Sequence, residues 1–167
     1  SKLLHRMGFQ AATYAQTKVI EGQLTRAITA NGLFFSTDGD KFFVVDDEHV
    51  DQWSLSTDWD VSSATYTKTA LDVGEEIVTS SSTYATTIYG LSFNDTGSTM
   101  FLLSDNKVVE RDLGTNWDMG SITDGGSSPD LSTANGNIFK AGLFFKPDGL
   151  EFYVMNTSKE IEQYTMS

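Results

Sequence analysis

Residues 32–45 read Gly-Leu-Phe-Phe-Ser-Thr-Asp-Gly-Asp-Lys-Phe-Phe-Val-Val, and this stretch decides the fold because the chain repeats it. A second copy begins at Gly90 and a third at Gly142. The first two copies align without a gap as far as Asp60 and Asp118. Chance does not explain agreement over so many positions, and the recurrence predicts a protein built from repeats of one structural unit.

Each copy has the features of short antiparallel strands. Asp38-Gly39 is typical of a tight turn in which the glycine supplies a positive φ. Residues 42–45 are apolar on both faces, as expected of a strand that lies between two neighbouring sheets. The strands predicted in the first copy are 33–35, 42–45, 50–55 and a polar edge strand at 64–69. Four antiparallel strands in roughly 50 residues are the unit of a β-propeller blade.

The repeats divide one all-β domain, residues 1–167, into three predicted four-stranded blades. A chain of this length can bury a sizeable core as a single domain. Blade one is predicted at 32–89, blade two at 90–141 and an incomplete blade three at 142–167, after a closing strand and linker at 1–31.

The third copy ends before its fourth strand, and a matching segment lies at the other end of the chain. Ala12-Thr13-Tyr14 matches Ala64-Thr65-Tyr66, which predicts that an N-terminal strand completes the last blade. Propellers have ~4–8 blades, and three would leave the ring strained or open. We therefore expect two copies to close a six-bladed ring as a homodimer. The alternatives are a piece of a longer propeller and a nine-bladed ring of three chains.

The repeat resembles known propeller families. Its pattern Gly-Leu-x-Phe-x-x-Asp-Gly-x-x-Phe-(Phe/Tyr)-Val is similar to NHL-like and YVTN-like blades. Residues 55–66, Leu-Ser-Thr-Asp-Trp-Asp-Val-Ser-Ser-Ala-Thr-Tyr, resemble tandem repeats of marine phage structural proteins and of some marine bacterial surface proteins. The second copy keeps Trp117 and Asp118 but departs from the pattern at 119–121. The resemblance implies a β-propeller fold and a virion or extracellular, cell-surface location, although a fold does not determine a function.

The composition narrows the range of partners. Lys and Arg number 11 and Asp and Glu number 23, which gives a formal net charge of −12. This acidity argues against a nucleic-acid partner, whose phosphates require a basic surface, and against anionic lipid. The chain has no cysteine, which excludes disulfides, thiolate metal sites and cysteine nucleophiles. No apolar run approaches the ~20 residues of a membrane-spanning helix, so we expect no membrane insertion.

The sequence offers little for catalysis, and we predict no enzyme, no catalytic residues, no cofactor and no metal. The two histidines are His5 and His49, and the chain has neither a Gly-x-Ser-x-Gly motif nor a phosphate-binding glycine loop. Residues 46–48, Asp-Asp-Glu, offer carboxylates for Ca²⁺ but lack the spacing of an EF-hand loop, and a solvated turn explains them as well. The alternative is a glycoside hydrolase or lyase that uses paired carboxylates on a propeller scaffold.

The tryptophans are the best candidates for ligand binding. Trp59-Asp60 and Trp117-Asp118 occupy equivalent positions, and an indole can stack on a sugar ring while a carboxylate accepts its hydroxyl protons. The competing interpretation places both indoles between blades as core and both aspartates at strand corners, where they accept backbone N–H bonds. Trp53 occupies a position that varies between the copies and is expected to be partly exposed.

Together these features predict a non-enzymatic structural and recognition module of a virion or cell surface. In this hypothesis the propeller presents its loops to a glycan or to a protein partner. A pure assembly element without a ligand is a third hypothesis.

Overall fold

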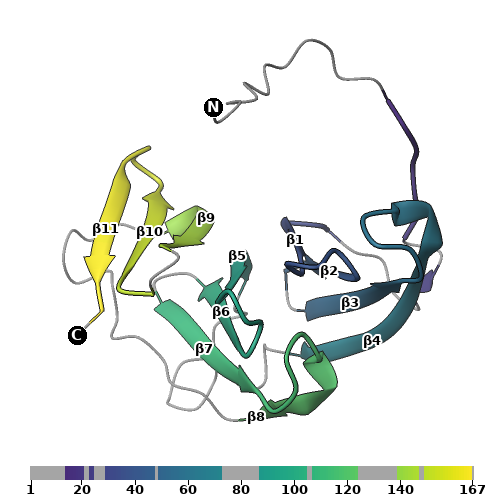
Figure 1. The fold of residues 1–167 in the computed structure, drawn as a ribbon. Helices are drawn as coiled ribbons and strands as arrows, with labels where there is room; N and C mark the ends of the chain where they lie inside the picture. Colours follow the sequence, from purple (N-terminus) through teal and green to yellow (C-terminus); the bar gives the residue numbers. More distant parts are fainter. Residues whose placement is uncertain are drawn as a thin grey trace, which may run out of the picture.

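A computed structural model describes residues 14–20, 23–24, 29–47, 49–72, 87–104, 107–123, 139–146 and 149–166. Within these residues the fold is all-β, with three antiparallel sheets of four, four and three strands. The sheets follow one another along an open arc, and the first and third sheets stand at its two ends (Figure 1). The all-β prediction is therefore confirmed.

Each sheet has its strands in chain order, from the inside of the arc outward (Figure 1). The first sheet consists of β1 (Gly32–Phe35), β2 (Lys41–Val45), β3 (His49–Leu55) and β4 (Ala64–Asp72). The second consists of β5 (Ile88–Phe93), β6 (Thr99–Ser104), β7 (Lys107–Leu113) and β8 (Ile122–Thr123), and the third of β9 (Phe139–Phe145), β10 (Glu151–Asn156) and β11 (Ile161–Thr165). Short 3₁₀ turns, η2 (Val61–Ser63) and η3 (Met119–Ser121), precede β4 and β8. In the part of the chain that the structure describes, no helix is long and apolar enough to cross a membrane.

The strand register confirms that the sheets repeat one unit. One pair of facing residues on the second and third strands recurs in every sheet: Phe43 and Gln52, Phe101 and Glu110, Tyr153 and Gln163. The turn before the second strand places glycines at equivalent positions with positive φ: Gly39 at 73°, Gly97 at 68° and Gly149 at 71°. These are left-handed conformations that glycine adopts without steric cost, so the turn predicted at Asp38-Gly39 is confirmed.

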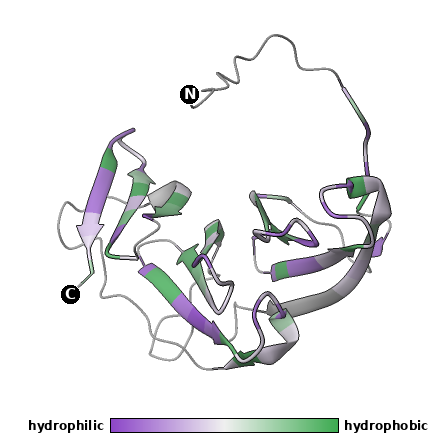
Figure 2. Cartoon of the chain, in the orientation of Figure 1, coloured by the Kyte–Doolittle hydropathy of each residue, from purple (hydrophilic) through white to green (hydrophobic). Residues whose placement is uncertain are grey.

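Apolar side chains join neighbouring sheets face to face. The first sheet contributes Phe43 and Val45 to a cluster with Phe93 and Met100 of the second sheet. A separate cluster brings the second and third sheets together, and it includes Leu103, Phe145, Phe152 and Val154. Hydrophobic residues concentrate on β5 and β6 in the middle of the arc, whereas β11 at its end is mostly hydrophilic (Figure 2). The alternation of side chains along each strand thus supplies two packing faces per sheet.

The predicted completion of the third sheet is not seen within a single chain. Ala12 and Thr13 lie outside the described residues, and Tyr14 belongs to no strand and is exposed. Among the described residues β11 is therefore the outer edge of a three-stranded sheet. Completion of this sheet by an N-terminal strand stays a prediction.

Candidate functional site

The two equivalent tryptophans have the same local structure. Trp59 and Trp117 both have positive φ, 63° and 59°. Each backbone N–H donates to the carbonyl of a turn glycine, Gly39 at 2.9 Å and Gly97 at 2.8 Å. Each indole also lies directly against that glycine and leaves no room for a Cβ there. We call this arrangement, the Trp-Asp pair with its indole packed on the turn glycine, the corner. The repeat forms the same corner in the first and second copies, so any difference between the two indoles comes from their surroundings.

The surroundings of the two indoles differ sharply. Trp117 is 8% exposed and packs against Phe34, Phe43 and Phe93, with the Phe93 ring centre 5.1 Å away. Trp59 is 60% exposed and stacks on Phe35 at 5.5 Å. Phe34 and Phe43 belong to the first sheet, which lies beside Trp117. No described sheet lies beside Trp59 on the corresponding side, and this accounts for its exposure.

The aspartates that follow the tryptophans hold the corners together. Asp60 Oδ1 accepts the Ser62 N–H at 2.9 Å, and it also accepts the Ser62 hydroxyl at 2.7 Å and the Gln16 Nε2 amide at 2.6 Å. Asp118 Oδ1 accepts the Gly120 N–H at 2.9 Å. The hydrogen bonds from Ser62 and Gln16 hold the pKa of Asp60 below its ordinary value. The capping role considered for both aspartates is confirmed.

The expected partial exposure of Trp53 is wrong. Its side chain is fully buried and stacks on Phe42 with a ring separation of 5.1 Å. Tyr66 of β4 packs on it as well, and the same cluster includes Ile20 and Leu24 from the segment before the first sheet. The equivalent Tyr164 stacks in the same way on Phe152, the equivalent of Phe42, and the equivalent Arg111 is buried, so variation at this position does not indicate exposure.

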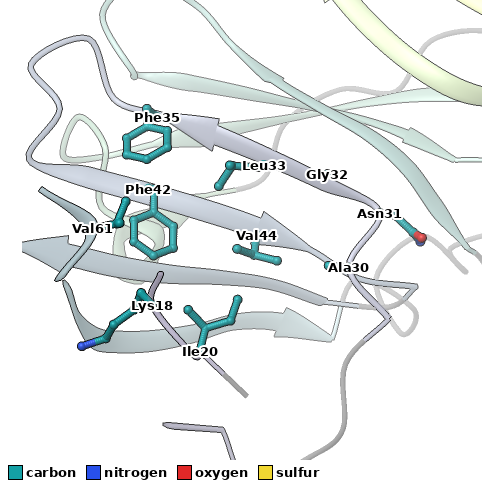
Figure 3. A pocket seen from close by; sticks show the side chains of 10 residues that line it. All are labelled: Lys18, Ile20, Ala30, Asn31, Gly32, Leu33, Phe35, Phe42, Val44 and Val61. Atoms are coloured by element: carbon teal, nitrogen blue, oxygen red, sulfur yellow. The ribbon is translucent and has the colours of Figure 1, made fainter. Parts of the chain in front are cut away.

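The face of the first sheet that is turned away from the second sheet is apolar and only partly covered. We call it the open face, and it consists of Leu33, Phe35, Phe42 and Val44, with Trp59 at its edge. Leu33, Phe35, Phe42 and Val44 line a pocket of about 510 Å³ together with Val61, and Lys18 and Ile20 close its other side (Figure 3). Lys18 is the one charged side chain of the lining.

Residues 14–20 and 23–24 form hydrogen bonds with the outer part of the first sheet. Gln16 donates to Asp60, and Gln23 Oε1 accepts the Tyr66 N–H at 2.9 Å. Ile20 packs beside the cluster that contains Trp53, while Tyr14 and Val19 are exposed. Sequence reasoning assigned this segment to the third sheet and missed these contacts, since no repeat pattern marks Gln16 or Gln23.

The described residues show no cluster that could hold a metal ion. His49 Nδ1 lies 3.3 Å from Asp46 Oδ1, which also accepts the His49 backbone N–H at 2.7 Å. This is a local turn contact. No three His, Asp or Glu side chains among the described residues gather closely enough to hold a metal ion. His5 and Glu48 lie outside the described residues.

Comparisons with known proteins identify structures that have a similar fold. No family model and no curated protein matches the chain. Solved structures do match, and one is the β-propeller domain of Cps50 (Swd1) from Myceliophteria thermophila, at 11% identity and a TM-score of 0.52 over 83% of this chain and 38% of that one. The fold is β-propeller-like.

Two further solved structures match the chain with similar coverage and TM-scores. One is a candidate 6-phosphogluconolactonase from Bacteroides uniformis ATCC 8492, at 17% identity and a TM-score of 0.52, over 81% of this chain and 36% of that one. The other is a functionally unknown protein from Desulfotomaculum acetoxidans DSM 771, at 14% identity and a TM-score of 0.51, over 82% of this chain and 39% of that one. The chain thus spans well under half the length of these structures. At such identities the likeness shows the fold alone, and the resemblance to NHL-like, YVTN-like and marine phage repeats stays a prediction.

Proposed function

We propose that the chain is a non-enzymatic structural and recognition module whose open face receives a further blade, and that two copies close a six-bladed ring at a virion or cell surface. The contrast between Trp59 and Trp117 carries the proposal. The two corners share one local structure, and the indole is buried where a sheet lies beside it and exposed where none does.

Leu33 supports the same conclusion. It is 62% exposed, whereas Leu91, its equivalent in the second sheet, is 8% exposed because the first sheet covers it. Contiguous exposed apolar side chains mark interaction sites. The pocket on the open face is lined almost entirely by apolar groups, which suits another apolar sheet face better than a charged partner.

A sugar is the second candidate ligand of this face. The Trp59 indole is exposed and the Asp60 carboxylate follows it in the corner, an arrangement that suits stacking with hydrogen bonding. A docked sheet would cover Trp59, so the two occupants exclude each other there. We favour the sheet because Leu33 of the open face is also exposed and offers no partner to sugar hydroxyls. The strand-joining loops of the ring would stay free to contact a glycan or a protein.

Trp59 is itself the probe that tests the proposal. The chain has three tryptophans, and Trp59 is exposed while Trp53 and Trp117 are buried. Acrylamide quenching of tryptophan fluorescence is measured over a range of protein concentrations, with Trp59→Phe as the matched control. At low concentration the wild type is expected to have a readily quenched component that Trp59→Phe lacks. That component should become protected and blue-shifted as the protein associates.

Two results would contradict the proposal. A Trp59 component that stays equally quenchable at every protein concentration would mean that the open face receives no second copy. Protection of Trp59 by an added polysaccharide at low protein concentration would assign the face to a sugar instead. Turnover of that polysaccharide with a bell-shaped pH profile set by two carboxyl groups would favour the glycoside hydrolase or lyase.

A further inference from the structure

We infer that the exposed face of the third sheet docks head to tail on the open face of a second copy of this chain. The inference rests on the proposed function and names the two surfaces that meet. The exposed face of the third sheet, called the terminal face below, consists of Phe144, Tyr153, Met155, Ile161 and Gln163.

The alignment of the repeats shows which residues of the first sheet correspond to the terminal face. Its members are the equivalents of first-sheet residues that face the second sheet: Phe34, Phe43, Val45, Val50 and Gln52. In the first sheet this face is covered, and Val50 is completely buried. In the third sheet Ile161, the equivalent of Val50, is 73% exposed. The terminal face is therefore equivalent to an inter-sheet face, and no sheet among the described residues lies against it.

The two interfaces within the chain show which aromatic rings should meet at the third. Phe43 packs on Phe93 with 4.7 Å between ring centres, and Phe101 packs on Phe145 at 3.9 Å. These pairs occupy equivalent positions. The next pair of the series is Tyr153 of one copy on Phe35 of the other.

The same argument explains the exposed tryptophan. Phe34 stacks on Trp117 with ring centres 6.2 Å apart. The equivalents of these two residues are Phe144 and Trp59, and both are exposed. A head-to-tail contact would place Phe144 of one copy over Trp59 of the other and bury both rings.

One buried hydrogen bond joins the first and second sheets, and the residues equivalent to its donor and its acceptor lie at the open face and on the terminal face. Gln52 Oε1 accepts the Met119 N–H at 2.9 Å and joins the first sheet to the corner of the second. Gln163 is the equivalent of Gln52 and is exposed, and Val61, the equivalent of Met119, lines the pocket on the open face. Glutamine is thus present on the terminal face where the docked geometry requires an acceptor.

The N-terminal segment lies where the outermost strand of the incoming sheet would lie. In the chain itself β4, the outermost strand of the first sheet, lies against η3 of the second sheet. Residues 14–20 approach the equivalent turn η2 through the hydrogen bond from Gln16 to its N-cap Asp60. The third sheet has three described strands with β11 at its edge. Each copy can therefore provide the fourth strand of its partner's third sheet, which closes two identical head-to-tail junctions into a ring.

Charge substitutions at one exposed residue of each surface test the inference. Leu33→Lys alters the open face, and Phe144→Lys alters the terminal face. Leu150→Lys is the matched control, because Leu150 is 58% exposed but belongs to neither surface. All three side chains are exposed in the single chain, so circular dichroism should show unchanged folding. Mass is measured by light scattering on a size-exclusion column over a dilution series.

The wild type and Leu150→Lys are expected at twice 18.3 kDa. Leu33→Lys and Phe144→Lys should each raise the dissociation constant by at least about 30-fold, the loss typical of one interface hot spot. An equimolar mixture of these two variants is the decisive sample. In a mixed pair one junction carries both lysines and the other carries neither, so the mixture should recover the doubled mass at concentrations where each variant alone is monomeric.

The outcomes separate this inference from the proposed function. If Phe144→Lys stays dimeric while Leu33→Lys does not, the open face binds a second copy but the terminal face is not its partner, and the inference is wrong. If the mixture shows no recovery, the junction is not head to tail. A wild type that is monomeric at every concentration would overturn both the ring and this inference. A mass of three times 18.3 kDa would replace the two-copy ring by a nine-bladed one.

Discussion

Substitution of the three turn glycines by alanine tests how the corners are built. Gly39, Gly97 and Gly149 hold equivalent positions with nearly equal positive φ. An L-residue in this conformation costs about 1–2 kcal/mol in each case. The three sites differ in what the new methyl group would meet, so the series separates backbone strain from contact with an indole.

The magnitudes follow from those surroundings. Nothing lies within 4 Å of a Cβ placed on Gly149, so Gly149→Ala should lower the free energy of unfolding by about 1–2 kcal/mol. At Gly97 the methyl group would overlap Trp117, which is buried between two sheets. Complete loss of a buried Trp side chain costs about 3–5 kcal/mol, so a partial displacement adds roughly 2–3 kcal/mol and brings Gly97→Ala to about 4 kcal/mol. At a protein concentration where the chain is monomeric, Gly39→Ala should fall between them at about 2 kcal/mol, because Trp59 is exposed in the single chain and can move aside.

The assay is urea unfolding of the wild type and the three variants at one protein concentration. The urea concentration at the unfolding midpoint should fall least for Gly149→Ala, more for Gly39→Ala and most for Gly97→Ala. The dependence of the unfolding free energy on urea concentration should stay unchanged. If Gly149→Ala is as destabilising as Gly97→Ala, contact with the indole is not the cause. If Gly97→Ala loses only about 1 kcal/mol, Trp117 does not pack as described.

Two further predictions concern hydrogen bonds at the corners. Gln52→Ala should leave the buried Met119 N–H without its acceptor and lower the free energy of unfolding by about 1–3 kcal/mol. Gln163→Ala should have little effect on the monomer, because Gln163 is exposed there. Urea unfolding compares the two variants, and equal losses of stability would show that the bond to Met119 is not the cause. Since hydrogen bonds from Ser62 hold the pKa of Asp60 below its ordinary value near ~4, the stabilisation from this carboxylate is present above that pH and lost as the pH falls below it. Ser62→Ala keeps the backbone N–H but removes the hydroxyl donor, so it should raise the Asp60 pKa in an NMR titration, and an unchanged pKa would show that the hydroxyl bond is absent in solution.

Much of the architecture could be predicted because its causes are local. The Asp38-Gly39 turn recurs with positive φ at every copy, since a tight turn selects glycine wherever it occurs. The apolar run at 42–45 lies in a central strand, and its side chains divide between two clusters, because alternate residues point to opposite faces. The aspartate after each Trp accepts backbone N–H groups within its own corner.

The exposure of the candidate site residues could not be predicted in this way. Trp53 varies between copies, and variation suggested a surface position, yet the indole is buried because Phe42 and Tyr66 pack on it in a cluster that also includes Ile20 and Leu24. Tyr164, the equivalent of Trp53 in the third copy, stacks on Phe152 in the same way, so variation at a repeat position does not report exposure. The contacts of Gln16 and Gln23 with the first sheet follow no pattern in the chain and depend on where that segment folds back.

The strands, the turns, the corners and the period at which they recur could thus be predicted from the chain, since each of these depends on residues a few positions apart. Which of the repeated faces are covered depends on tertiary packing and could not be predicted from the repeat. Trp59 and Trp117 have the same local environment in the chain, and they differ because burial depends on whether another sheet stands beside the corner. For the same reason Leu33 and Trp59 of the open face and Phe144 and Ile161 of the terminal face are exposed, on the sheets that stand at the two ends of the arc (Figure 1).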